Sequence, residues 1–184
     1  ARLDAGRELR REEVDLVGLL VDTVADARAA GPEHDWQLDL AVLEPPAGAT
    51  PQEAEDFLPE PPLVIGDEAR LRQVIVNLLA NARVHTPAGS HVTTTLTREG
   101  DALMVRIHDD GPGIAPDVRD RLFERFARGD SSRERRTGST GLGMSIAQAI
   151  VQSHGGSIDV GSSTAPEDHG TTFTVRLPAA VVEE

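Results

Sequence analysis

The stretch from Asp67 to Thr86, DEARLRQVIVNLLANARVHT, restricts the fold of this chain more than any other part of its sequence. Its apolar residues recur at helical spacing and form one face: Leu71, Val74, Ile75, Leu78, Leu79 and Ala82. Asp67 stands where a helix N-cap is expected, and Pro87 follows the pattern at its other end. The spacing therefore predicts a helix over 67–86 that packs one face against a hydrophobic core.

Two asparagines lie at the edge of this apolar face. Asn77 and Asn81 are one helical turn apart, so their side chains share a flank of the expected helix. The helix alone leaves two interpretations open. The amides either face water and cap loops, or they meet a polar group opposite.

The rest of the chain mixes helical and strand-like patterns. Periodicity predicts further helices over 16–30, 117–126 and 142–154, and strands over 36–42, 63–66, 91–98, 102–108, 157–161 and 171–177. Two pairs of these strands read as hairpins, and no βαβ unit repeats. The pattern predicts a two-layer α/β sandwich whose mixed, mostly antiparallel sheet is covered by helices on one face.

Composition limits the possible functions. A chain of 184 residues suits one domain, with no run of 18 apolar residues and no signal-peptide pattern. The absence of cysteine excludes disulfides and thiolate metal sites, and a net charge of −13 argues against nucleic-acid and acidic-membrane partners. All 18 basic residues are arginine, so any Lys-type or Arg-type cation on a phosphate must be Arg.

Two segments stand apart from this pattern. Residues 1–10 are charged and are predicted to be the end of a helix, while residues 11–184 form the domain. Residues 44–62 contain six prolines and several acids, which is typical of a solvated or disordered loop. The alternative for this insertion is an arm that docks a partner.

Two glycine-containing motifs bear on chemistry. Asp109–Gly113, DDGPG, directly follows a predicted strand, where glycines allow a sharp turn and a close approach to a flat ligand. By itself it also reads as an ordinary turn. Gly138–Gly143, GSTGLG, lies where a loop runs into a helix, so its free N–H groups could hold an anion or the segment could be a hinge. It lacks the lysine of a P-loop and the preceding strand of a dinucleotide fingerprint.

These motifs, together and in this order, resemble the catalytic and ATP-binding domain of sensor histidine kinases of two-component systems. That domain belongs to the wider gyrase, Hsp90, histidine kinase and MutL superfamily. The matching stretches are DEARLRQVIVNLLANARVHTP, IHDDGPGIAPD, LFERFARGD and GSTGLGMSIAQAIVQSHGG, and they lie between Asp67 and Leu177. The resemblance implies a Bergerat-type ATP-binding fold.

The resemblance also implies roles for particular residues. Asn81 matches the asparagine that binds Mg²⁺ on ATP, Asp109 the aspartate that accepts the adenine amino group, and Arg128 an arginine near the γ-phosphate. Asn77 and Arg128 would be the catalytic residues, and 129–140 the ATP lid. The implied nucleotide-binding set is Asn77, Asn81, Arg83, His85, Asp109, Gly111, Gly113, Ile114, Phe126, Arg128, Thr140, Gly141, Leu142, Gly143 and Met144.

Phe123 and Phe126 match an aromatic box that packs under the lid, with plain core aromatics as the alternative. Ser139 occupies a place where the family often has glycine, which restricts the backbone of the lid hinge.

The helix departs from the family at two positions. Val84 stands where the family often has a lysine, so Arg83 or His85 would have to neutralise phosphate instead. Asn77 stands where gyrase-like relatives carry a glutamate that activates water. An amide is no general base, so the sequence favours transfer of phosphate over rapid hydrolysis.

The expected function is transfer of the γ-phosphate of Mg-ATP to a histidine on a dimerisation hairpin absent from this chain, for relay to a response-regulator receiver domain. The His-acid pairs at His34 and His108 lie in a turn and a strand, so neither fits as acceptor. The resemblance implies a monomeric fragment of a homodimer, cytoplasmic and attached to an inner-membrane sensor. Alternatives are a gyrase- or Hsp90-like ATP hydrolase, an anti-sigma-type serine kinase and a nucleotide-binding module without catalysis.

Overall fold

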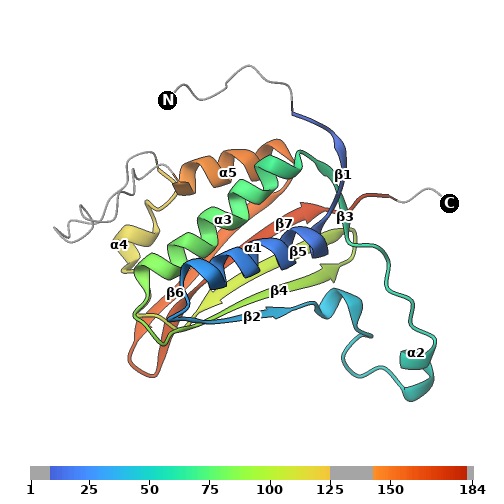
Figure 1. Cartoon of the computed structure of the whole chain (residues 1–184), viewed down its shortest axis with the longest axis horizontal. Coiled ribbons are helices and arrows are strands. Elements are labelled where there is room, and N and C mark those ends of the chain that lie inside the picture. The colour runs from blue at the N-terminus through green and yellow to red at the C-terminus, as the bar shows by residue number, and fades with distance from the viewer. Residues whose placement is uncertain (1–8, 125–142, 182–184) are drawn as a thin grey trace.

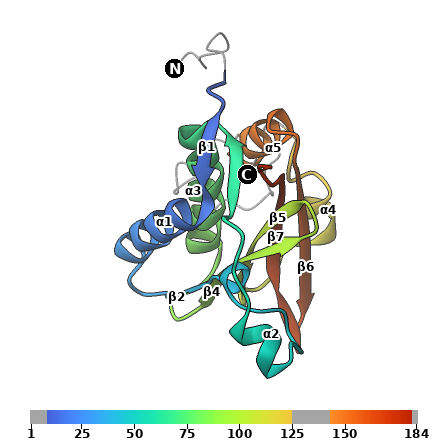
Figure 2. The ribbon, with the colours of Figure 1, turned by 90° about the vertical axis from the view of Figure 1, so that its right-hand side faces the viewer.

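The protein is described here by a computed structural model, which covers residues 9–124 and 143–181. Three helices lie side by side on one face of a five-stranded sheet: α1 (Leu16–Ala30), α3 (Glu68–His85) and α5 (Gly143–Ser153). Seen from the side, the helices form one layer and the sheet the other (Figure 1, Figure 2). The predicted two-layer α/β sandwich is confirmed.

The sheet has the strand order β2–β4–β5–β7–β6. Its strands are β2 (Asp35–Asp39), β4 (His91–Glu99), β5 (Ala102–Asp109), β6 (Ser157–Ala165) and β7 (Asp168–Pro178). Only the β2–β4 pair is parallel, and the other three pairs of this sheet are antiparallel. The register places Asp109, the last residue of β5, opposite Thr171 of β7.

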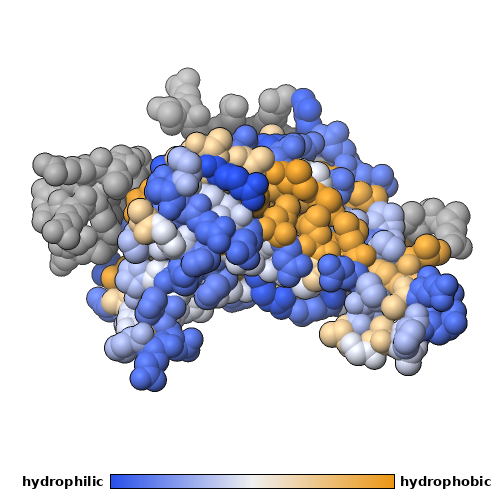
Figure 3. All heavy atoms as spheres, turned by 60° about the horizontal axis from the view of Figure 1, so that its bottom comes forward, coloured by the Kyte–Doolittle hydropathy of each residue, from blue (hydrophilic) through white to orange (hydrophobic). Residues whose placement is uncertain are grey.

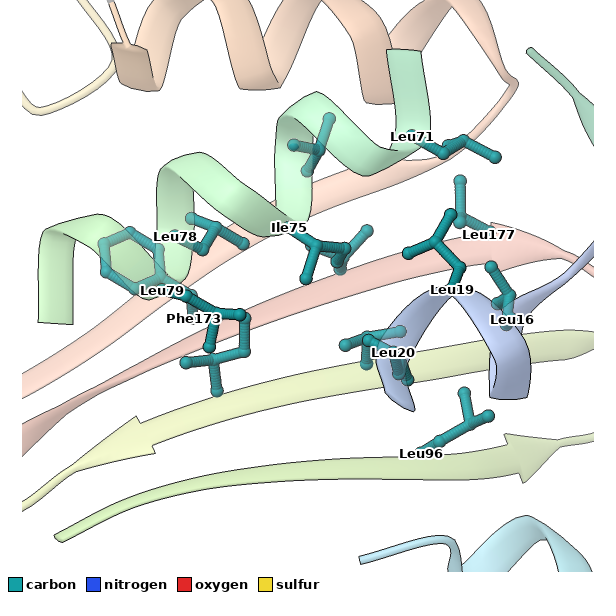
Figure 4. Close-up of a cluster of buried hydrophobic side chains, with 14 of the residues drawn as sticks. Leu16, Leu19, Leu20, Leu71, Ile75, Leu78, Leu79, Leu96, Phe173 and Leu177 are labelled. Atoms are coloured by element: carbon teal, nitrogen blue, oxygen red, sulfur yellow. The ribbon is translucent and has the colours of Figure 1, made fainter. Parts of the chain in front are cut away.

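The core lies between the helices and the inner face of the sheet (Figure 4). All six apolar residues predicted for α3 are buried there. They pack with Leu16, Leu19 and Leu20 of α1, Leu96 of β4, and Phe173 and Leu177 of β7. Full burial of one such side chain contributes about 1.5–3 kcal/mol, so this face of α3 fixes the helix on the sheet.

Three hydrogen bonds of Asp67 fix the start of α3. Asp67 caps the helix by accepting a hydrogen bond from the N–H of Arg70 at 3.2 Å, as the sequence predicted. The N–H of Asp67 itself donates to His154 Nε2 at 3.0 Å, and the N–H of Arg10 approaches the Asp67 carboxylate at 3.4 Å. His154 follows the last residue of α5, so Asp67 joins the start of α3 to the end of α5.

A second, two-stranded sheet was not predicted. β1 (Glu12–Asp15) pairs antiparallel with β3 (Leu63–Gly66), the predicted strand that leads into α3. β1 was missed because three of its four residues are exposed and only Val14 is buried, so it carries almost no apolar pattern. Residues 1–8 of the expected terminal helix lie outside the described part of the chain, and Leu9 and Arg10 are irregular.

Other predicted elements change their extent, among them the two closing strands, which run further toward their shared turn as β6 (Ser157–Ala165) and β7 (Asp168–Pro178). The strand predicted over 36–42 covers Asp35–Asp39, and its last residues form η1 (Ala41–Leu43). The insertion 44–62 contains α2 (Pro51–Glu55). Thr50 and Glu53 form a capping box at the N-terminal end of this helix. The helix predicted over 117–126 is α4 (Pro116–Arg119) followed by turns to Glu124.

The face shown in Figure 3 is largely hydrophilic, with one large apolar area and smaller ones toward its edges. Large exposed apolar residues include Val21 on α1 and Leu43 on η1, which are 45% and 40% exposed. In the two described ranges, no helix is both long enough and apolar enough to cross a membrane.

Candidate functional site

Apart from Arg83, the predicted site residues that the structure describes lie on one flank of α3, at the end of β5 and in the turn after it, and at the start of α5. Asn77, Asn81 and His85 follow one another at four-residue intervals along one flank of α3. Gly143 and Met144 open α5. Asp109, Gly111, Gly113 and Ile114 lie at the end of β5 and in the turn that follows it.

Asn77 ties α3 to α5. Its amide Nδ2 donates a hydrogen bond to the backbone oxygen of Gly143 at 3.2 Å. This contact fixes α3 to the first residue of α5, and the N-terminal end of a helix is in general suited to an anion. It also settles the interpretation left open by the sequence for Asn77, because its amide meets a polar group opposite rather than water alone.

Asn81 lies one turn further along α3 and is half-buried. Within the described ranges its side chain makes no hydrogen bond to protein, so its amide oxygen is available to a ligand. An amide oxygen suits Mg²⁺, which keeps several waters and needs few protein ligands. The described residues contain no group of three or more His, Asp or Glu side chains that could hold a metal ion.

Asp109 is a buried carboxylate, 5% exposed, at the end of β5. Its Oδ1 accepts the N–H of Gly111 at 3.0 Å. Burial raises the pKa of this carboxyl, while the Gly111 hydrogen bond and the nearby His108 and His85 act against that rise. The arrangement leaves a fixed acceptor that can receive a hydrogen bond from an exocyclic amino group.

A hydroxyl network beside Asp109 was not predicted. Thr171, buried opposite Asp109, has its Oγ1 2.9 Å from Ser162 Oγ. Ser162 also accepts the N–H of Ile114 at 2.8 Å and donates to the oxygen of Gly170 at 2.9 Å. The hydroxyls thus hold the turn after β5 against the β6–β7 hairpin, and only the strand pairing could reveal them.

The two glycines of the DDGPG turn lie where neighbouring atoms leave no room for a Cβ. Gly113 has a φ of +78°, and a Cβ there would lie 2.0 Å from the backbone oxygen of Ser163. A Cβ on Gly111 would lie 2.5 Å from Thr86 Cγ2. The close approaches explain why both positions carry glycine.

We expect Gly113→Ala to lower the free energy of unfolding more than Gly100→Ala. Gly100 also has a positive φ, +62°, but a Cβ there meets nothing within 4 Å. Alanine at Gly100 should cost about 1–2 kcal/mol from the backbone alone, and at Gly113 roughly another 1–3 kcal/mol from the clash. Urea unfolding of both variants measures the difference, and equal losses would contradict the close packing of Gly113.

Arg83 and His85 occupy different sides of α3. The Cδ of Arg83 lies 2.7 Å from where a Cβ of Gly31 would be, so its stem covers the end of α1. Arg83 is two residues beyond Asn81, or about 200° around the helix, whereas His85 is about 40° from Asn81. The structure therefore brings His85, and not Arg83, to the flank that carries both asparagines.

Part of the predicted set lies outside the described ranges: Phe126, Arg128, Thr140, Gly141, Leu142 and the lid 129–140. Two described neighbours pack on the core. Phe123 and Met144 are half-buried against it, which agrees with the plain core interpretation for Phe123.

Comparison with known proteins identifies relatives of the whole region. The family model of histidine kinase-, DNA gyrase B-, and HSP90-like ATPases matches residues 66–181. The probable sensor histidine kinase TcrY of Mycobacterium tuberculosis is 48% identical over 178 residues, which cover 97% of this chain and 33% of TcrY. The sensor histidine kinase TrcS of the same organism is 39% identical, with 97% and 32% covered.

Solved structures agree with this match. The mycobacterial sensor histidine kinase MprB superposes with a TM-score of 0.73 at 28% identity, over 91% of this chain and 98% of that structure. Full-length ShkA in complex with AMPPNP gives a TM-score of 0.73 at 27% identity, over 98% of this chain and 33% of ShkA. The chain spans about a third of the length of the curated relatives it matches.

Proposed function

The chain belongs to the histidine kinase-, DNA gyrase B-, and HSP90-like ATPase family, and from this premise we propose that it is the kinase domain of a sensor histidine kinase. The domain transfers the γ-phosphate of ATP to a histidine on a dimerisation hairpin, for relay to a response-regulator aspartate. One observation carries the proposal. Asn77 of α3 bonds the first residue of α5, and Thr86 at the end of the same helix packs on Gly111, whose N–H binds the buried carboxylate of Asp109.

Different residues of the chain bind different parts of Mg-ATP. Asp109 accepts the adenine amino group, and the turn with Gly111 and Gly113 admits the flat base. Asn81 holds Mg²⁺, which when bound neutralises charge on the phosphates. His85 lies on the same flank and takes the place of the family lysine, while Arg83 supports the end of α1.

The remaining assignments concern residues outside the described ranges. Arg128 approaches the γ-phosphate, and Thr140, Gly141 and Leu142 continue the phosphate site that Gly143 opens. The lid 129–140 excludes water from the phosphates when it closes. Catalysis by such a site is mostly positioning and charge neutralisation.

Asn77 distinguishes transfer from hydrolysis. Its Nδ2 is engaged with the Gly143 oxygen, and an amide cannot take a proton from water as a glutamate does. The site therefore lacks a general base at the position where gyrase-like hydrolases have one, and it holds ATP until a histidine is presented.

We propose the partners and location on the strength of the relatives. These are named sensor histidine kinases, and about two thirds of their length lies outside the match. That length leaves room for a dimerisation hairpin and a sensor. The partners are then this hairpin and a receiver domain, and the domain is cytoplasmic in a homodimer anchored to the inner membrane.

Labelled ATP tests the proposed function directly. Incubation of the chain with γ-labelled ATP, Mg²⁺ and a supplied dimerisation hairpin should place label on the hairpin histidine. Without the hairpin, free phosphate should appear only slowly, because Asn77 is no base. A hairpin with its histidine replaced by alanine is the control. Rapid phosphate release without any hairpin would favour the hydrolase and contradict the proposal.

A further inference from the structure

His34 is a buried histidine that the proposed phosphoryl transfer does not use. It lies in the turn between α1 and β2 and is 7% exposed. Its Nε2 is 2.9 Å from the hydroxyl of Thr86, the residue that caps the carboxyl end of α3. A segment before the part matched by the family model therefore reaches the helix that carries both asparagines.

The direction of this hydrogen bond follows from its neighbour. The Thr86 hydroxyl donates its single hydrogen to the backbone oxygen of Ala82 at 2.8 Å. It can then only accept from His34, so Nε2 carries a hydrogen. The Thr86 hydroxyl is thus hydrogen-bonded on two sides, to Ala82 and to His34, which fixes the direction in which the side chain points.

The other end of Thr86 contacts the nucleotide site. Its Cγ2 and Cβ lie 2.5 and 3.1 Å from the place that a Cβ on Gly111 would take. The Thr86 methyl group therefore packs directly on Gly111, whose N–H donates to Asp109 Oδ1. A continuous line of contacts runs from His34 through Thr86 and Gly111 to Asp109.

The turn that carries His34 is itself fixed. The backbone oxygen of Glu33 accepts the N–H of Gly89 at 2.7 Å, and the N–H of Asp35 donates to the oxygen of Ser90 at 2.9 Å. The Trp36 ring lies 5.7 Å from the His34 ring. His34 thus presents its Nε2 from a rigid support rather than from a free side chain.

We propose that His34 is a positioning residue of the nucleotide site. Its hydrogen bond to the Thr86 hydroxyl keeps the Thr86 methyl group packed on Gly111. This packing fixes the turn in which the N–H of Gly111 binds the carboxylate of Asp109. This inference rests on the proposed function, because it assigns the adenine wall of the same site to a residue outside the family motifs.

Replacement of His34 tests the hydrogen bond. His34→Phe keeps a ring of similar size but removes the donor, and we expect ADP affinity to fall about fivefold by calorimetry. His34→Gln carries an amide Nε2 that can reach Thr86, so it should restore most of the affinity. A purely structural role in filling the core would be served better by Phe than by Gln.

Replacement of Thr86 separates the two ends of the contact. Thr86→Val keeps the methyl on Gly111 but loses the hydroxyl, so it should match His34→Phe, and the double variant should add no further loss. Thr86→Ser keeps the hydroxyl and loses the methyl. Thr23→Val is the matched control, because Thr23 makes the same bond to the oxygen four residues earlier, at 2.8 Å, within α1. It should bind ADP as wild type does.

The amide resonance of Gly111 gives a readout without nucleotide. It should shift in His34→Phe and return toward its wild-type position in His34→Gln. The inference is overturned if His34→Phe binds ADP like the wild-type chain or leaves this resonance unmoved. A wild-type chain that binds no ADP refutes the proposed function instead, and the Gly111 resonance then decides the inference by itself.

Discussion

Asn81→Ala is expected to abolish phosphorylation of a supplied dimerisation hairpin, with a loss of about 10²–10³-fold in rate. Asn81 is half-buried and its side chain makes no protein hydrogen bond in the described ranges, and we propose that its oxygen binds Mg²⁺. Its removal leaves the phosphate charge without the neutralisation that transfer requires. The rate of label transfer from γ-labelled ATP measures the effect.

The matched control for Asn81 is Gln52→Ala. Gln52 also carries a side-chain amide, but it lies in α2, and its Nε2 donates to Asp56 at 2.9 Å within the insertion. That variant should transfer phosphate at the wild-type rate. Because Asn81 is not a core residue, circular dichroism of Asn81→Ala should show a folded protein. Retained transfer in a folded Asn81→Ala protein would exclude the proposed role.

Asp109→Asn should weaken ATP and ADP alike, by about tenfold or more, because a hydrogen bond to a charged group is replaced by one to a neutral amide. The same change should stabilise the protein without nucleotide at neutral pH, since it removes a buried charge. Calorimetry with ADP and thermal unfolding of the free protein measure the two effects. Unchanged ADP affinity would refute the assignment of Asp109 to adenine.

The pH dependence follows from the raised pKa of Asp109. Its folded-state pKa lies above the ordinary value of 3.8, so the protonated form is the one that favours folding. The stability it contributes is present below pH 3.8 and is lost as pH rises through the folded-state pKa. Nucleotide affinity should show the opposite trend and fall as pH drops through that pKa, because the acceptor becomes protonated.

Asp110→Asn is a control whose expected effect on the stability of the free protein is opposite to that of Asp109→Asn. Burial acts to raise the pKa of Asp110, but hydrogen bonds from His91 outweigh it and lower the pKa. Its carboxylate accepts the backbone N–H of His91 at 2.8 Å and lies 2.9 Å from His91 Nδ1. Asp110→Asn should therefore destabilise the free protein at neutral pH while nucleotide affinity stays unchanged.

The parts of the fold that the sequence predicted are those with local signals. The face of α3 and its Asp67 cap were readable because the helical period and the capping residue lie within one segment. β1 was missed because its partner is about 50 residues away and its own residues are mostly exposed. α2 was missed although its signal was present, since Thr50 and Glu53 have capping-box spacing with Pro51 at the first helical position.

The site shows the same division. Asn77, Asn81 and Asp109 were predicted because family motifs mark them, and the structure places Asn77 against the first residue of α5 and Asp109 at the end of β5. Ser162 and Thr171 were missed because their place beside Asp109 depends on strand register. Between Arg83 and His85 the sequence could not choose, and the contact of Arg83 with Gly31 supplied the reason from tertiary packing.

The antiparallel pairing of β1 with β3 gives the domain a mechanical property. Because Glu12 pairs with Gly66 and Asp15 with Leu63, a pull on the N-terminal end of β1 loads the Glu12–Gly66 pair first. That pair is one residue from Asp67, where α3 begins. Traction on this end would therefore open the small sheet first at the residue that precedes the N-cap of α3, the helix that carries both asparagines.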